Sequence, residues 1–269
     1  MGKRDLAERR PVARAVLIGV GLTALLVGGG AALVGSPDSE PTAEAAAPDD
    51  EKPRSSTSPV PPPTGSPSLT PGPEAPSRIP IPPDGPGTFT TARSTGSPVG
   101  SGDAVLRYTV QVENGIDLSE RDAAVEIETI LAHPRGWTSD GRNSFQLVGS
   151  GPSDFDVKIA TPGTVDRICG AAGLLTRGEV NCTVGHSVVV NLKRWVLGSE
   201  QFDGPVTEYR ALIINHEVGH RLGKGHVTCG EAGKPAPAMM QQIKGLHGCL
   251  ANAWPYAEDG AYITGPAVS

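Results

Sequence analysis

The sequence predicts an α+β domain, close to the α/β class, that is built around one central helix. Short stretches in which apolar and polar residues alternate predict strands, and apolar stripes at helical spacing predict helices. The helix expected after residue 205 is apolar on most of its sides. A helix of that kind lies at the centre of a domain.

The elements follow one another in the order strand, helix, strands, helix. The first strand is expected at residues 106–112, where apolar and polar residues alternate. A helix follows from about Ser119 and is closed by Pro134. Further strands are expected at residues 145–148, 155–159 and 187–192, and the last is apolar enough to be buried. The central helix should begin near Pro205, with Asp203 as its cap.

The central helix carries the motif on which the functional interpretation depends. His216 and His220 lie four residues apart, so both rings project from one face of the helix and can reach a single metal ion. Glu217 stands beside the first histidine, where it can handle the proton of a metal-bound water. Gly223 allows the chain to turn sharply and to bring His226 to the same ion.

Three imidazole ligands with an open fourth position describe a catalytic zinc site, because structural zinc sites fill all four positions with protein ligands. The pattern H-E-x-x-H-x-x-G-x-x-H is complete from His216 to His226. Here the sequence resembles the metzincin clan of zinc peptidases, and about residues 103–260 resemble an uncharacterised actinobacterial family of anchored metzincin-like domains.

The resemblance implies a twisted mixed sheet and a methionine-containing turn beneath the metal. Met239 is the preferred candidate for that turn, and Met240 follows directly. It also implies an antiparallel edge strand above the zinc, within residues 172–185, that would align an extended peptide. No tyrosine directly follows the methionines, so the extra tyrosine ligand of some metzincins has no counterpart.

All four cysteines lie in the domain expected at residues 101–269. Outside the cytoplasm an even number of cysteines indicates disulfides, and four cysteines allow three pairings. We favour Cys169–Cys182 and Cys229–Cys249, because each pair closes a short local loop.

The amino-terminal part predicts export. Residues 1–14 form a basic cytoplasmic tail, and residues 15–34 are an uncharged apolar run long enough to cross a bilayer. This run is longer than the apolar region of most signal peptides, which favours a single-pass membrane anchor. The alternative is a secreted protein, cut by a signal peptidase near Ala43–Ala45.

Residues 35–100 predict a disordered linker between the membrane and the domain. They hold seventeen of the twenty-six prolines and almost no large apolar residue, so they cannot bury a core. An inhibitory propeptide is the other interpretation of this segment. The net charge is −6, and the sequence has no run of Lys and Arg residues of the kind that binds phosphates, so we do not expect a nucleic acid as a partner.

These observations predict a membrane-anchored, extracytoplasmic zinc endopeptidase, expected to act as a monomer on a peptide or protein substrate. Zinc would be held by His216, His220 and His226, with Glu217 as the general base. Two alternatives stay open at this stage. One is hydrolysis of peptide cross-links in the cell wall, and the other is a non-catalytic surface module that contains zinc.

Overall fold

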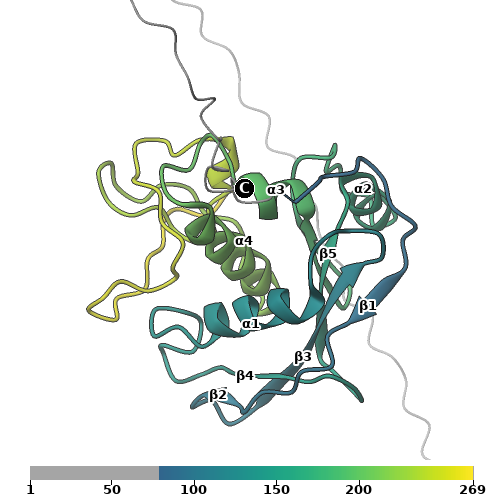
Figure 1. The fold of residues 1–269 in the computed structure, drawn as a ribbon. Coiled ribbons are helices and arrows are strands. Elements are labelled where there is room, and N and C mark those ends of the chain that lie inside the picture. The colour runs from purple at the N-terminus through teal and green to yellow at the C-terminus, as the bar shows by residue number, and fades with distance from the viewer. Residues whose placement is uncertain (1–78, 269) are drawn as a thin grey trace, which may run out of the picture. The chain divides into compact units, whose positions relative to one another are not determined.

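A twisted sheet of mixed strand direction forms the framework of the protein (Figure 1). The computed structural model describes residues 79–268, which lie within one unit spanning Leu69–Ser269. Within the described residues the sheet has seven strands, and six of them follow the order β2-β4-β3-β5-β7-β6. The strands are β1 (Phe89–Thr91), β2 (Val99–Gly100), β3 (Val105–Glu113), β4 (Ser144–Leu147), β5 (Phe155–Ala160), β6 (Cys182–Val184) and β7 (Ser187–Asn191).

Parallel pairing joins the inner strands, and antiparallel pairing adds the short ones. β3 runs parallel to both β4 and β5, and β5 runs parallel to β7. β1 pairs antiparallel with β3, and β2 pairs antiparallel with β4. β6 pairs antiparallel with β7 and forms one edge of the sheet. An antiparallel edge strand therefore lies within residues 172–185, where the resemblance implied one.

Helices cover both faces of this sheet. They are α1 (Glu120–Leu131), α2 (Pro162–Gly170), α3 (Leu192–Leu197) and α4 (Val206–Arg221), and a short 3-10 helix, η1, spans Gln242–Lys244. Along β7, Val188 and Val190 belong to the main core, whereas Val189 packs into a smaller cluster with Val165 and Cys169 of α2. Because neighbouring residues of a strand point to opposite faces, α2 lies on the face opposite the main core.

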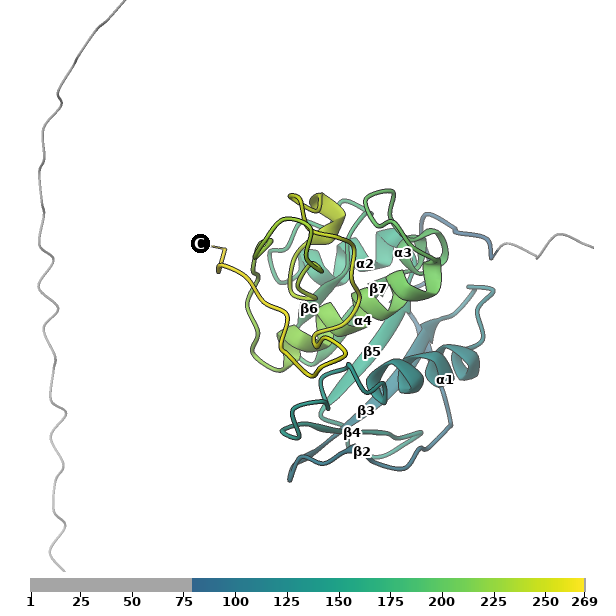
Figure 2. The same ribbon diagram turned by 90° about the vertical axis from the view of Figure 1, so that its left-hand side faces the viewer.

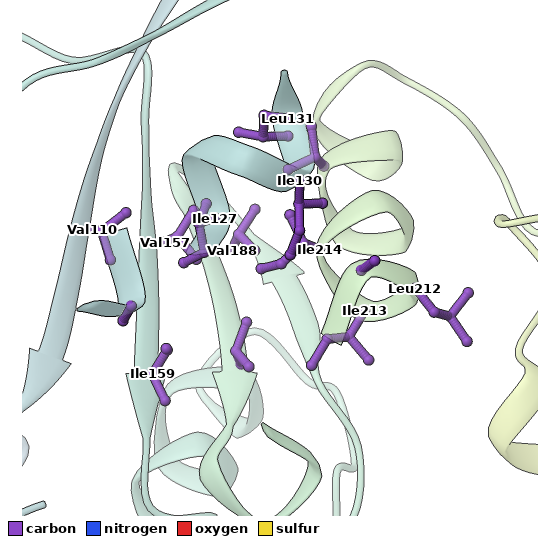
Figure 3. Packing of buried hydrophobic residues seen from close by; sticks show 14 of the residues in the cluster. Val110, Ile127, Ile130, Leu131, Val157, Ile159, Val188, Leu212, Ile213 and Ile214 are labelled. Atoms are coloured by element: carbon purple, nitrogen blue, oxygen red, sulfur yellow. The ribbon is translucent and has the colours of Figure 1, made fainter. Parts of the chain in front are cut away.

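The main core lies between the sheet and the helices α1 and α4 (Figures 2 and 3). Ile127 of α1 and Ile214 of α4 are fully buried against Val110 and Val157 of the inner strands. Leu212 of α4 points away from the sheet (Figure 3). The helix that carries the histidine motif is therefore held from one side by the core, while another side remains available for a site.

The regular elements predicted from periodicity are present. Strands occur where alternation indicated them, and α1 begins after Ser119, whose side chain accepts a hydrogen bond from the backbone N–H of Asp122 at 3.2 Å. The predicted cap of the central helix is wrong. Pro205 occupies the N-cap of α4, which has no side-chain cap, because the extended conformation of the proline leads directly into the first turn.

The predicted end of the linker at residue 100 is also wrong. Residues 79–100 contain β1 and β2, and Ala92 is fully buried in the main core. Hydrogen bonds and an ion pair, rather than large apolar side chains, attach this Pro-rich stretch to the domain. The N–H of Gly87 donates to Glu113 at 2.7 Å, and Asp84 pairs with Arg167 at 2.6 Å.

No helix in the range 79–268 is long and apolar enough to span a bilayer. The predicted anchor at residues 15–34 lies outside the described residues, as does most of the predicted linker.

Candidate metal centre

The three histidines of the motif converge on one point. His216 and His220 project from the last two turns of α4, and the helix ends at Arg221. Gly223 follows with φ +76°, a left-handed conformation that costs glycine little and most other residues more. The chain thereby reverses and returns His226 to the two helical histidines, as the spacing predicted.

The distances between the ring nitrogens fit one bound ion. The Nε2 atoms of His216 and His220 lie 3.2 Å apart, and those of His216 and His226 also lie 3.2 Å apart. The Nε2 atoms of His220 and His226 are separated by 3.1 Å. Three nitrogens at about 2.0–2.1 Å from a tetrahedral zinc ion would lie about 3.3 Å from one another. The triangle of nitrogens therefore has nearly the size that zinc requires.

The hydrogen bonds behind two of the rings, those of His216 and His220, fix which ring nitrogen carries the proton. Nδ1 of His216 lies 2.8 Å from the carbonyl oxygen of Ala238, and Nδ1 of His220 lies 2.9 Å from that of Lys224. A carbonyl oxygen only accepts, so both Nδ1 atoms carry the proton, and in a neutral imidazole Nε2 then carries the lone pair. Lone pairs directed at one another at this distance repel unless a cation lies between them.

The protonation state of His216 supports the same conclusion. Burial, together with the nearby charge of His220, lowers the pKa of His216 to about 3. The pKa of His226 is also lowered, by burial and then by the charges of His220 and Lys244. These two rings are neutral at pH 7, which is the form that binds a metal ion.

Glu217 lies beside this centre and is held by the edge strand of the sheet. Only 5% of its surface is exposed. Its Oε2 atom lies 2.8 Å from the Oγ1 atom of Thr183 in β6, and Glu217 is one of the residues that line the cleft. Burial raises the pKa of Glu217 to about 7, and the hydrogen bond from Thr183 acts in the opposite direction. A carboxylate with a pKa near neutrality suits a general base.

Both methionines lie beneath or beside the motif helix, in different roles. Met239 is buried in the main core, and a Cβ atom at Gly219 would lie 2.2 Å from its Sδ atom. Only glycine therefore allows α4 to rest on Met239 without displacement. Met240 is also buried but lines the cleft, and it pairs with Val227 next to the third histidine.

Two disulfides and the carboxyl-terminal segment brace the site. Both favoured pairings are present, Cys169–Cys182 and Cys229–Cys249. The N–H of Val268 donates to the carbonyl oxygen of His226 at 3.1 Å, and that of Thr228 donates to Pro266 at 2.9 Å. The strand-like segment that carries the third histidine is thus paired with residues far along the chain.

The centre opens into a cleft of about 960 Å³. Helix α4 contributes the three motif residues His216, Glu217 and His220, and β6 contributes Cys182 and Thr183. Most residues of the loop 174–181 and the segment of residues 240–244 line further parts of it, as do His226 and Arg221. A cleft of this size accommodates several residues of an extended peptide, and the edge of β6 runs along it.

A family model described as a protein of unknown function, DUF3152, matches residues 75–253. The chain belongs to this family. No curated protein and no solved structure matches the chain. The DUF3152 match includes the three histidines, Glu217 and all four cysteines. The carboxyl-terminal segment that pairs with His226 and Thr228 lies beyond the DUF3152 match.

Two residues that shape the site were not singled out from the sequence. Thr183 contacts Glu217, and Arg221 donates to the carbonyl oxygens of Gly185 at 2.6 Å and Asp154 at 3.1 Å. Thr183 has no sequence signal, because its role depends on where β6 lies. Arg221 occupies a variable position of the motif, so the pattern does not indicate a role for it.

Proposed function

We propose that this protein is an extracytoplasmic zinc endopeptidase with a metzincin-like active site. One observation carries the proposal: three imidazole nitrogens converge within 3.2 Å beside a buried carboxylate, in a cleft at the edge of a sheet. The donor set suits zinc, since it consists of three histidines with no fourth protein ligand among the described residues.

His216, His220 and His226 would hold the ion. When bound, zinc supplies a Lewis acid that polarises a carbonyl group and lowers the pKa of a water molecule to about 7. The other contributions come from the chain itself. Glu217 accepts the proton of a water in the cleft and later passes it to the amine that leaves. Thr183 holds one oxygen of Glu217 and so orients the other toward the cleft.

The exposed edge of β6 supplies the expected place for a substrate. An extended peptide that pairs with a sheet edge gains main-chain hydrogen bonds without a demand on its sequence. The two disulfides agree with an oxidising compartment and hence with export. Anchoring through residues 15–34 completes the proposal, with the catalytic domain on the outer side of the membrane.

A broad peptide library tests the activity. Full-length protein that holds one zinc per chain should cleave library peptides, lose cleavage on treatment with a chelator, and regain it on addition of zinc. Casein and purified cell-wall material, assayed in parallel, separate a protein substrate from a wall peptide. Zinc-loaded protein that cleaves neither the library nor the two larger substrates would contradict the proposal and favour a non-catalytic module.

A further inference from the structure

The cleft carries positive charge in a protein whose net charge is −6. Three cationic side chains line it, those of Arg177, Arg221 and Lys244. They belong to three separate segments, the loop after α2, the end of α4 and the end of η1. None of the three forms an ion pair with a carboxylate of residues 79–268.

The acidic residues of the cleft do not neutralise these cations. Glu179 pairs with Lys193 at 2.6 Å and also with Arg194, so two further cations take up its single charge. Glu217 is buried and bound to Thr183. A cleft walled by protein focuses the field of unpaired charges and raises the local concentration of ligands of opposite sign.

The loop that carries Arg177 also presents apolar surface. Leu174 is 43% exposed and Leu175 is 80% exposed, and both line the cleft two or three residues before Arg177. The Cys169–Cys182 disulfide joins the two ends of this loop. A large apolar side chain that remains so exposed on the wall of a cleft is suited to contact a ligand.

We infer that the cleft selects peptide segments that carry a carboxylate next to a large apolar side chain. Arg177 and Lys244 supply the positive charge that attracts the carboxylate, and the exposed side chain of Leu175 supplies the apolar contact. The peptide nature of this ligand rests on the proposed function, while the preference for negative charge rests on the residues of the cleft alone. Arg221, which is bound to two backbone carbonyls, contributes a fixed charge and no direct contact.

A series of matched peptides tests the inference. The parent peptide has one Glu beside a Leu and an amidated end. In the first relative Gln replaces Glu, in the second Ser replaces Leu, and in the third Glu becomes Gln while the terminal carboxylate is free. The third distinguishes a side-chain carboxylate from a terminal one. Binding to full-length Glu217→Gln protein is measured by fluorescence anisotropy at low and high salt, and kcat/KM is measured with the wild type.

The parent should bind more tightly than its Gln relative, by about two- to fivefold for each cation engaged, and salt should reduce the difference. Lys244→Gln and Arg177→Gln should each lower the Glu-to-Gln ratio by about that factor. The matched control Arg121→Gln removes an exposed cation from α1, outside the cleft, and should leave the ratio as it is. Leu175→Ser should reduce the preference for Leu over Ser.

The binding measurements on the Glu217→Gln protein test the preference for acidic peptides independently of the proposed peptidase activity. Tighter binding of the acidic peptide without hydrolysis by the wild type would support the inference and contradict the endopeptidase. Equal binding of the Glu and Gln peptides would overturn the inference, even if both are hydrolysed. So would a preference for Glu that persists in the Lys244→Gln/Arg177→Gln double variant with an unchanged melting temperature.

Discussion

Gly219→Ala probes the contact between the motif helix and the methionine beneath it. The added Cβ atom would lie 2.2 Å from Sδ of Met239 and 2.8 Å from Cζ2 of Trp137. The methionine can shift, but the indole is fully buried and donates from Nε1 to the carbonyl oxygen of Asn215 at 2.8 Å. Overpacking of this kind costs about 1–3 kcal/mol.

The helical preference of alanine over glycine offsets about 1 kcal/mol of that cost. The net loss should be at most about 2 kcal/mol, which for a domain of this size lowers the melting temperature by up to about 8 °C. Because α4 must move to relieve the overlap, zinc retention should fall as well. Thermal unfolding followed by circular dichroism and titration with a competing chelator measure the two effects.

Gly170→Ala is the matched control, because it lies in α2 and a Cβ there meets no atom within 4 Å. It should be neutral or slightly stabilising. In a Met239→Ala background the cost of Gly219→Ala should shrink, since one of the two overlaps is gone. Equal melting temperatures and equal zinc retention in Gly219→Ala and Gly170→Ala would show that the contact of Gly219 with Met239 and Trp137 does not constrain the helix.

Three further predictions concern the centre itself. His226→Ala should reduce the zinc content well below one per chain in elemental analysis, whereas His247→Ala, at an exposed position outside the cleft, should not. Thr183→Val should move the acid limb of the kcat/KM profile to higher pH, because loss of the hydrogen bond raises the pKa of Glu217, which acts in its ionised form. Thr183→Ser should restore the acid limb to its wild-type position. Identical pH profiles for wild type and Thr183→Val would exclude a role for this contact. Deletion of residues 264–269 removes the hydrogen bond from Val268 to His226 and should weaken zinc binding in a chelator competition. If the shortened protein retains zinc as well as the full chain does, this segment does not brace the third histidine.

The convergence of the three histidines could be predicted from the sequence because their relation is local. Two histidines four residues apart on a helix share one face whatever surrounds them, and Gly223 needs only its own backbone freedom to return His226. The disulfide pairings are local in the same sense. Thr183 is different, since it meets Glu217 only when β6 has paired with β7 and the sheet has packed on α4.

The amino-terminal boundary was missed for a related reason. Composition identified the Pro-rich segment as unable to bury a core. Glu113, on the neighbouring strand β3, nevertheless accepts hydrogen bonds from Gly87 of this segment and from Thr161 and Thr164 at the start of α2. Polar contacts of this type leave no periodic pattern in the sequence. The helix cap was misassigned because Asp203 precedes a proline whose fixed φ already prepares the first turn.

In the proposed mechanism, Glu217 acts as the base of a zinc-dependent peptidase. The most direct measurement compares kcat/KM for one library-derived peptide between wild type and Glu217→Gln, with equal zinc content in both. Glutamine keeps the size of the side chain and removes the base, so the rate should fall by about 10²–10⁴-fold, while zinc retention and melting temperature stay close to those of the wild type. Equal rates in the two proteins would show that Glu217 is not the base and would contradict the mechanism.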